Sequence, residues 1–256
     1  MSRHVAAVLI PALIVFGCGS AAPNEPPAAS PVVAPATSTL SVTASDYAFS
    51  AQDSIGAGPT LISLENRGEE IHHAQLWRLK DETTFEAYQA ILKKQSHDAT
   101  VAPIASFAGG VASLAPGQAA QAIVDLKPGT YALVCRVTRP SLHLYMGMVR
   151  KLVVTGQGSS STDWVPKADG TVTFENGHFS FPEALTAGHH VWTFHNAGPG
   201  PRAFEIKSKA GDYDGGAELI DEGSSQTVVL DLAPGDYRAT STWVAPDPTW
   251  TDFTVR

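Results

Sequence analysis

The sequence predicts an all-β protein built from two β-sandwich domains, and three observations lead to this prediction. Short segments alternate between apolar and polar residues along most of the chain, as half-buried strands do. Glycine and proline are frequent, at 22 and 18 residues, whereas charged residues make up only 16%. This composition favours strands joined by turns over long charged helices. The length of 256 residues suits two sandwiches, because about 100 residues already form one.

The N-terminal residues have the pattern of a targeting segment. Arg3 precedes an apolar run from Val5 to Phe16, which is too short to span a bilayer and therefore indicates a signal peptide. The end of this run resembles the lipobox of bacterial lipoproteins, in which the cysteine becomes the lipidated first residue. The resemblance implies a signal peptide over residues 1–18 and a lipid anchor on Cys18; the alternative is an ordinary signal peptide with a chance cysteine. We expect an extracytoplasmic protein on a bacterial membrane, and Gly19 in place of aspartate favours the outer membrane.

A proline- and alanine-rich tract follows over residues 19–38 and predicts an extended tether.

The chain has two cysteines, so lipidation of Cys18 would leave Cys135 without an intramolecular partner. A solitary thiol outside the cytoplasm is either buried and inert or acts as a ligand or nucleophile. Cys135 is therefore the central candidate for function.

The first predicted domain covers residues 39–156. Its alternating segments, bounded by Gly, Pro and Asn, predict strands over residues 40–44, 60–65, 74–79, 121–126, 130–135 and 149–154. One helix interrupts them, with Asp81 as the expected N-cap and Lys94 as the expected end. Phe85, Tyr88 and Ile91 or Leu92 share its apolar face, and a loop to Gly110 follows.

The second predicted domain covers residues 163–256 and repeats the first without the helix. Three local sequences recur in the same order, which predicts a tandem duplication. The matched segments are 42–49 with 174–181, Asn66-Arg-Gly with Asn196-Ala-Gly, and the Pro-Gly-x-Tyr segment ending at Tyr131 with the one ending at Tyr237.

The strand that begins at Gly129 ends at Cys135, and His143 and Met148 follow it. This order resembles the C-terminal copper loop of plastocyanin-like cupredoxins, in which Met precedes the closing strand. The resemblance implies cupredoxin-like Greek-key sandwiches and a type 1 copper site. The family's remaining histidine follows an Asn-x-Gly turn, for which the spacing favours His72 over His73. Adjacent strand residues face opposite sides, so only one of the two can point to the site.

The resemblance thus implies copper held by His72, Cys135 and His143, with Met148 as the axial ligand and Met146 as its competitor. Two imidazoles, a thiolate and a weak thioether suit both oxidation states of copper. Residues 136–142 form a longer loop than the family usually has, so this loop must bulge if both of its ends are to reach one metal.

The second copy lacks these ligands. Alignment of the repeats places Ser241 opposite Cys135, and Arg202 and Ala203 opposite the two histidines, so we expect no type 1 centre there. The histidines of this copy are expected at the surface; they are His178, His189, His190 and His195.

We expect a one-electron carrier that exchanges electrons with redox protein partners and turns over no substrate. Two alternatives remain open, namely a metal-free interaction module and a copper capture or delivery protein. A hydrolase with Cys135 as nucleophile and His143 as base is disfavoured, because no oxyanion-hole glycine motif accompanies the pair. A net charge of −8 with only 17 Lys and Arg argues against nucleic acid as a partner.

Overall fold

The computed structural model describes residues 38–94, 104–156, 158, 161–182, 185–241 and 249–256. Strands dominate these residues, and one helix lies in the first half, so the all-β prediction with an inserted helix is confirmed. The predicted signal peptide, Cys18 and almost all of the tether lie outside the described residues. No described helix has the length and apolar character needed to cross a membrane.

The first half contains nine strands and the helix in the described residues. They are β1 (Ser38–Ser45), β2 (Ala48–Ser50), β3 (Ser54–Gly56), β4 (Gly58–Asn66), β5 (His72–Leu79), α1 (Phe85–Lys93), β6 (Ala105–Leu114), β7 (Ala119–Leu126), β8 (Gly129–Val134) and β9 (Val149–Thr155). The second half contributes β10 (Gly170–Glu175), β11 (His178–Ser180), β12 (Gly188–Asn196), β13 (Arg202–Ser208), β14 (Tyr213–Ile220), β15 (Ser225–Leu232), β16 (Gly235–Ser241) and β17 (Thr249–Val255).

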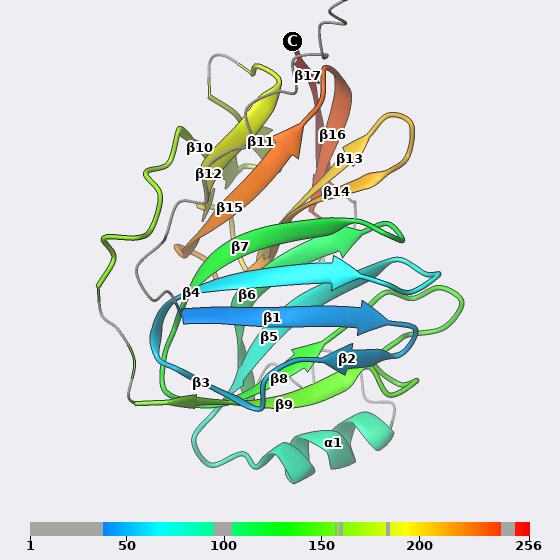
Figure 1. The fold of residues 1–256 in the computed structure, drawn as a ribbon, viewed down its shortest axis with the longest axis vertical. Helices are drawn as coiled ribbons and strands as arrows, with labels where there is room; N and C mark the ends of the chain where they lie inside the picture. The colour runs from blue at the N-terminus through cyan, green and yellow to red at the C-terminus, as the bar shows by residue number, and fades with distance from the viewer. Residues whose placement is uncertain (1–37, 95–103, 157, 159–160, 183–184, 242–248) are drawn as a thin grey trace, which may run out of the picture. The chain divides into compact units, whose positions relative to one another are not determined.

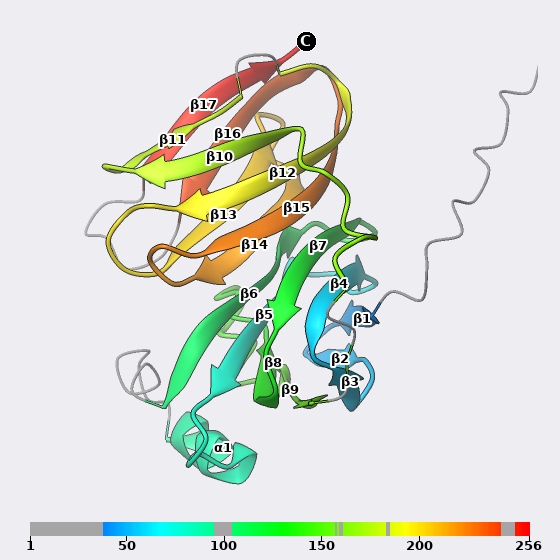
Figure 2. The ribbon, with the colours of Figure 1, turned by 90° about the vertical axis from the view of Figure 1, so that its left-hand side faces the viewer.

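These strands form two sheets, and each sheet runs through both halves (Figures 1 and 2). One has the order β11-β10-β12-β15-β7-β4-β1-β2, and the other has the order β17-β16-β13-β14-β6-β5-β8-β9-β3. The halves are joined where β7 pairs with β15 and β6 pairs with β14, both antiparallel. The sequence pattern did not predict this continuation. All described residues belong to one compact unit, and the predicted domain boundaries stay a prediction.

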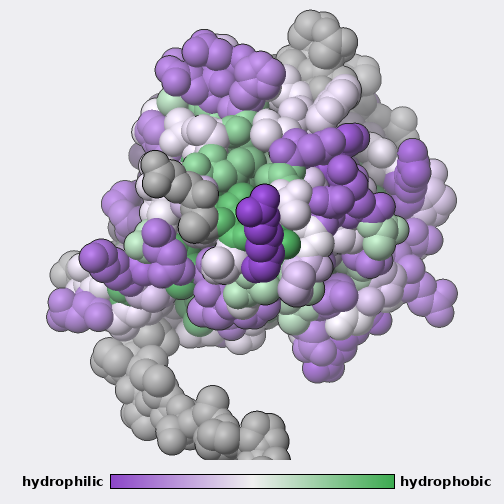
Figure 3. All heavy atoms as spheres, turned by 90° about the horizontal axis from the view of Figure 1, so that it is seen from above, coloured by the Kyte–Doolittle hydropathy of each residue, from purple (hydrophilic) through white to green (hydrophobic). Residues whose placement is uncertain are grey.

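Each half has its own apolar core between the two sheets. In the first half the core includes Leu40, Ile62, Leu76 and Tyr131, and the largest side chains of the second core are aromatic. A third cluster lies under α1, where Trp77 packs against Tyr88, Phe85 and Leu92. At the end of the molecule near the C-terminus, apolar residues gather within a rim of hydrophilic ones (Figure 3).

The helix face and the end of the helix are as predicted, but its N-cap is not. Phe85, Tyr88 and Leu92 are buried, whereas the N-cap is Thr84 and not Asp81. The Thr84 hydroxyl accepts a hydrogen bond from the backbone N–H of Ala87 at 3.1 Å, which satisfies one otherwise unpaired donor of the first turn.

The predicted loop to Gly110 is also wrong over its last residues, because β6 already begins at Ala105. Gly109 and Gly110 both have positive φ angles, of 83° and 137°, and they lie where the pairing of β5 with β6 shifts register. Glycine pairs are typical of turns and also of β-bulges, and here the pair marks a bulge inside a strand.

Two side-chain hydrogen-bonding arrangements occur in both halves at the positions that the repeat predicts. The amide nitrogen of Asn66 donates to the carbonyl oxygens of Glu70 and Leu114, and that of Asn196 donates to those of Gly200 and Ile220. The hydroxyls of Tyr131 and Tyr237 each donate to the carbonyl oxygen four residues earlier, at 2.9 Å in both cases. These contacts fix the chain at equivalent corners of the two sandwiches.

The expectation that all histidines of the second half lie at the surface is wrong for His190. Its side chain is buried, its Nε2 lies 2.6 Å from the carbonyl oxygen of Thr186, and its ring packs against Trp192. His178 and His189 are exposed, and His195 is partly buried. The alternating pattern alone did not separate the buried histidine from the exposed ones.

Candidate metal centre

The first candidate ligand is placed by the turn between β4 and β5. Asn66 is fully buried, and its side-chain oxygen accepts from the backbone N–H of Gly68 at 3.0 Å while its nitrogen donates to the carbonyl oxygen of Glu70. These hydrogen bonds stabilise the turn between β4 and β5, and β5 begins soon after the turn with His72. The imidazole of His72 therefore starts from a fixed backbone position.

The other candidate ligands come from the connection between β8 and β9. Cys135 follows β8, and its backbone N–H donates to the carbonyl oxygen of Met148 at 3.2 Å. Residues 136–142 bulge and return, and the N–H of His143 then donates to the carbonyl oxygen of Val137 at 2.9 Å. The long loop thus folds back far enough to bring both of its ends to one place, as the copper interpretation required.

His72, Cys135 and His143 meet at one buried point. The Sγ atom of Cys135 lies 3.8 Å from Nδ1 of His72 and 3.5 Å from Nδ1 of His143, and the two Nδ1 atoms are 3.1 Å apart. All three side chains are fully buried. Among the described residues, this is the group of His, Cys, Asp or Glu side chains whose ligand atoms could hold a metal ion.

The other nitrogen of each imidazole has a partner that fixes the ring. Nε2 of His72 lies 3.0 Å from a carboxylate oxygen of Asp46, and Nε2 of His143 lies 2.7 Å from the carbonyl oxygen of Arg139. Both oxygens can only accept, so each Nε2 carries a proton. In the neutral rings both Nδ1 atoms then carry lone pairs, and these face each other and the sulfur. A metal ion between them would accept these lone pairs, so the residues fit a bound metal.

The imidazoles also favour the thiolate form of Cys135. Burial raises the pKa of this thiol, but contacts with His73, His143 and His72 outweigh burial and hold the pKa well below its usual range. Burial lowers the pKa of His143, whereas the hydrogen bond and charge of Cys135 raise it further, so the net direction is upward. A deprotonated sulfur is the form that binds metal ions.

Two nitrogens and one thiolate are a donor set that suits copper. Thiolate and imidazole together are softer than the oxygen ligands that Mg²⁺ and Ca²⁺ require, and a His₂Cys set is typical of electron-transfer copper sites. The chemistry of the site therefore supports copper binding.

Met148 is the predicted axial ligand, and it is fully buried in the core that also contains Cys135. Its backbone bonds to both ends of the loop, since its N–H donates to the carbonyl oxygen of His143 at 3.0 Å. Its competitor Met146 is 41% exposed. The axial role of Met148 stays a prediction, and the burial of the two methionines favours it over Met146.

His73 does not join the group. It is buried on the other side of β5, where its Nδ1 contacts the carboxylate of Glu218 and its Nε2 accepts a hydrogen bond from the backbone N–H of Arg136. The structure thus brings His72, and not His73, to the cluster, in agreement with the spacing argument.

Sequence reasoning missed Asp46 and Tyr47, which lie in the turn between β1 and β2. Asp46 accepts from the backbone N–H groups of Glu69 and Glu70 as well as contacting His72. The N–H of Glu69 and then His72 lower the pKa of Asp46. Tyr47 has a φ of 64° and packs edge-on against the ring of His143, with centroids 5.1 Å apart. In the structure the turn that holds Tyr47 corresponds to the turn at Gly177, so the match of 42–49 with 174–181 is wrong by two residues. No local pattern pointed to Asp46 or Tyr47.

The second half has no such group among its described residues. Ser241 is buried and offers only a hydroxyl, and the guanidinium of Arg202 lies over the ring of Phe174, 5.2 Å from its centroid. Aromatic side chains fill the surrounding core.

No family model matches the chain, and no curated protein matches it. Similar solved structures include an auracyanin from Roseiflexus castenholzii, at 16% identity and a TM-score of 0.34, over 47% of this chain and 99% of that one. Auracyanin A, a "blue" copper protein from Chloroflexus aurantiacus, matches at 20% identity and a TM-score of 0.33, over 46% and 98%. A copper-containing nitrite reductase from Thermus scotoductus matches 85% of this chain at 12% identity and a TM-score of 0.24, and the match spans 61% of its own length. The interpretation of the site therefore depends on its own donor atoms.

Proposed function

We propose that the chain is a type 1 copper protein that carries single electrons. The observation that supports this most directly is the convergence of two Nδ1 atoms and one Sγ atom within 3.8 Å of one another in a fully buried place. Bound copper would supply one-electron redox chemistry. The chain would hold the ion with His72, Cys135 and His143, with Met148 as the axial group.

The chain's own residues suit this role in two ways. Partners on both Nε2 atoms restrict ring rotation, so the donor set can keep one geometry in both oxidation states. Burial excludes water, which disfavours exchange of the ion and leaves no open position for a substrate. We therefore propose a carrier and not an enzyme.

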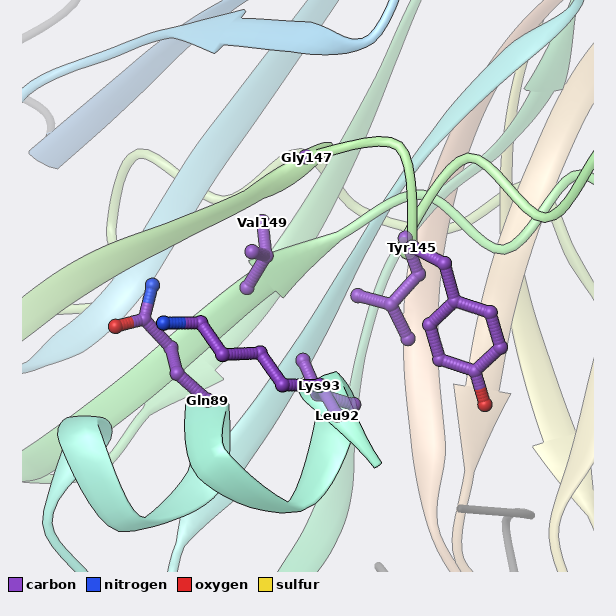
Figure 4. A pocket seen from close by; sticks show the side chains of 7 residues that line it. Gln89, Leu92, Lys93, Tyr145, Gly147 and Val149 are labelled. Carbon is purple, nitrogen blue, oxygen red and sulfur yellow. The ribbon is translucent and has the colours of Figure 1, made fainter. Parts of the chain in front are cut away.

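An apolar surface beside the site offers a place for redox partners. Tyr145 and Met146 follow His143 within three residues and are 38% and 41% exposed. Next to Tyr145 lies a hollow of about 370 Å³ between α1 and residues 144–149, to which Leu92, Tyr145 and Val149 contribute (Figure 4). Weak and transient redox encounters use small surfaces of this kind.

The proposal also covers the cellular location of the protein and the evolutionary origin of its two halves. We propose that Cys18 carries lipid, that residues 19–38 hold the folded part clear of a bacterial membrane, and that the protein works outside the cytoplasm. We also propose that the two halves arose by tandem duplication, which the matching corners at Asn66 and Asn196 support.

The first experiment is a titration of the metal-free chain with Cu(II), followed by visible absorption. We expect an intense thiolate-to-copper band that saturates at one equivalent, and its absence from the Cys135→Ser variant. If the parent shows no band and Cys135 remains freely titratable by a thiol reagent, the copper function fails and the chain is a metal-free module. Loss of copper during reduction and reoxidation would instead favour capture or delivery.

A further inference from the structure

The described residues of the second half form no metal-binding group, but one of their side chains reaches the loop that carries Cys135. Glu218 lies in β14, and its side chain is buried. Its carboxylate contacts Nδ1 of His73 in β5. The Nε2 of His73 in turn accepts from the backbone N–H of Arg136, the residue directly after Cys135. Three groups therefore connect the two halves at the metal centre.

The direction of these hydrogen bonds follows from the chemistry of the groups. A backbone N–H can only donate, so Nε2 of His73 must be the acceptor and the ring proton must be on Nδ1. The Glu218 carboxylate accepts a hydrogen bond from the Nδ1–H group of His73. This contact fixes the tautomer and the rotation of the imidazole. Without Glu218 the ring would be free to turn Nε2 away from Arg136.

We propose that Glu218 is a positioning residue through which the second half sets the geometry of the metal centre. Its effect passes from Glu218 to His73 and from His73 to the backbone of Arg136, and so limits the freedom of the Cys135 sulfur. The surroundings of the Cys sulfur, together with the axial ligand, tune the redox potential of a His₂Cys copper site. This proposal rests on the proposed copper function for its spectroscopic readout only.

A second contact between the halves provides a matched control. The side chain of Gln226 in β15 accepts from the N–H of Gly110 at 2.9 Å and donates to its carbonyl oxygen at 2.7 Å. It is buried like Glu218 and bridges the same two halves, but it contacts neither His73 nor the loop after Cys135. Gln226→Ala should loosen the junction without releasing the loop.

The test measures amide hydrogen exchange at Arg136 by NMR in the metal-free full chain and the absorption and EPR spectra after addition of Cu(II). We expect Glu218→Ala to speed exchange at Arg136 by at least about tenfold and to shift the thiolate band and the copper hyperfine splitting. Glu218→Gln keeps an oxygen that can accept from Nδ1 and should retain most of the parent behaviour. Gln226→Ala should leave the copper spectra unchanged, and it should speed exchange at Arg136 no more than at the other amides of β5 and β8.

The proposal is overturned if Glu218→Ala exchanges and absorbs like the parent, or if Gln226→Ala produces the same changes. If Glu218→Ala prevents folding, Glu218→Leu fills a similar volume without an acceptor and gives the same comparison. A parent chain that binds no copper would defeat the proposed function, yet the exchange rates at Arg136 would still decide whether Glu218 positions the loop.

Discussion

Replacement of Asp46 by asparagine tests whether the partner of a ligand contributes to metal affinity. Asp46 lies 3.0 Å from Nε2 of His72 and also accepts from the N–H groups of Glu69, at 3.1 Å, and Glu70, at 3.2 Å. Asparagine keeps one acceptor oxygen but loses the charge, and its NH₂ group would face an N–H donor of the turn. Loss of such a partner typically weakens metal binding by about 10–100-fold.

Because Asp46 is partly exposed, we expect a loss of metal affinity at the lower end of the range of about 10–100-fold. Its side chain is 32% exposed, so water screens part of the charge that acts on His72. We therefore expect Asp46→Asn to weaken copper binding by about tenfold, or about 1.4 kcal/mol, as measured by competition with a chelator of known affinity. The matched control is Asp53→Asn, because Asp53 is 91% exposed and pairs with Arg150 away from the cluster.

The reasoning is refuted if Asp46→Asn binds copper as tightly as the parent. It is also refuted if Asp53→Asn weakens binding by the same factor, because the effect would then reflect net charge and not the contact with His72.

Three further predictions concern stability. Thr84→Ala should lower the free energy of unfolding by about 1 kcal/mol in urea denaturation, because the N–H of Ala87 loses its cap, and an unchanged midpoint would contradict the N-cap assignment. Gln226→Ala should lower it by about 3 kcal/mol, since both buried polar groups of Gly110 lose their partner; a loss below about 1 kcal/mol would show that these bonds are replaced. The pKa of Asp46 is lowered in the folded chain, so the stability that its charge provides is present above its unfolded pKa of about 4 and is lost as the pH falls below that value. Unfolding measured at a series of acidic pH values should therefore show a steeper loss for the parent than for Asp46→Asn, and equal slopes would contradict this assignment.

Local patterns in the sequence predicted much of the fold and of the site. Period-two alternation marked the strands, and the resemblance to plastocyanin-like copper loops implied His72, Cys135 and His143, which the structure brings together. The helix face was predictable from its spacing, but the N-cap was not, because Asp81 and Thr84 both have side chains that cap helices. Asp46 was missed because its role depends on a contact with His72 across the fold, which no local pattern encodes.

The pairing between the halves could not be predicted for a similar reason. Strand β7 was predicted from its alternation and β6 was not predicted as a strand, and nothing in either sequence identifies the second half as the neighbour on their open side. The position of Glu218 could not be predicted either, because it contacts His73, which lies far away in the chain.

The continuous sheets give a reason for the chain to keep a second half whose described residues form no metal-binding group. Strands β6 and β7 would both become sheet edges if the second half were removed, since β14 and β15 are their outer neighbours. Open edges with unpaired N–H and C=O groups recruit strands from other chains. A shortened protein that ends after β9 would retain every proposed copper ligand but would expose two unpaired sheet edges. In the full chain β14 and β15 pair with these two strands, so neither edge is open to another chain.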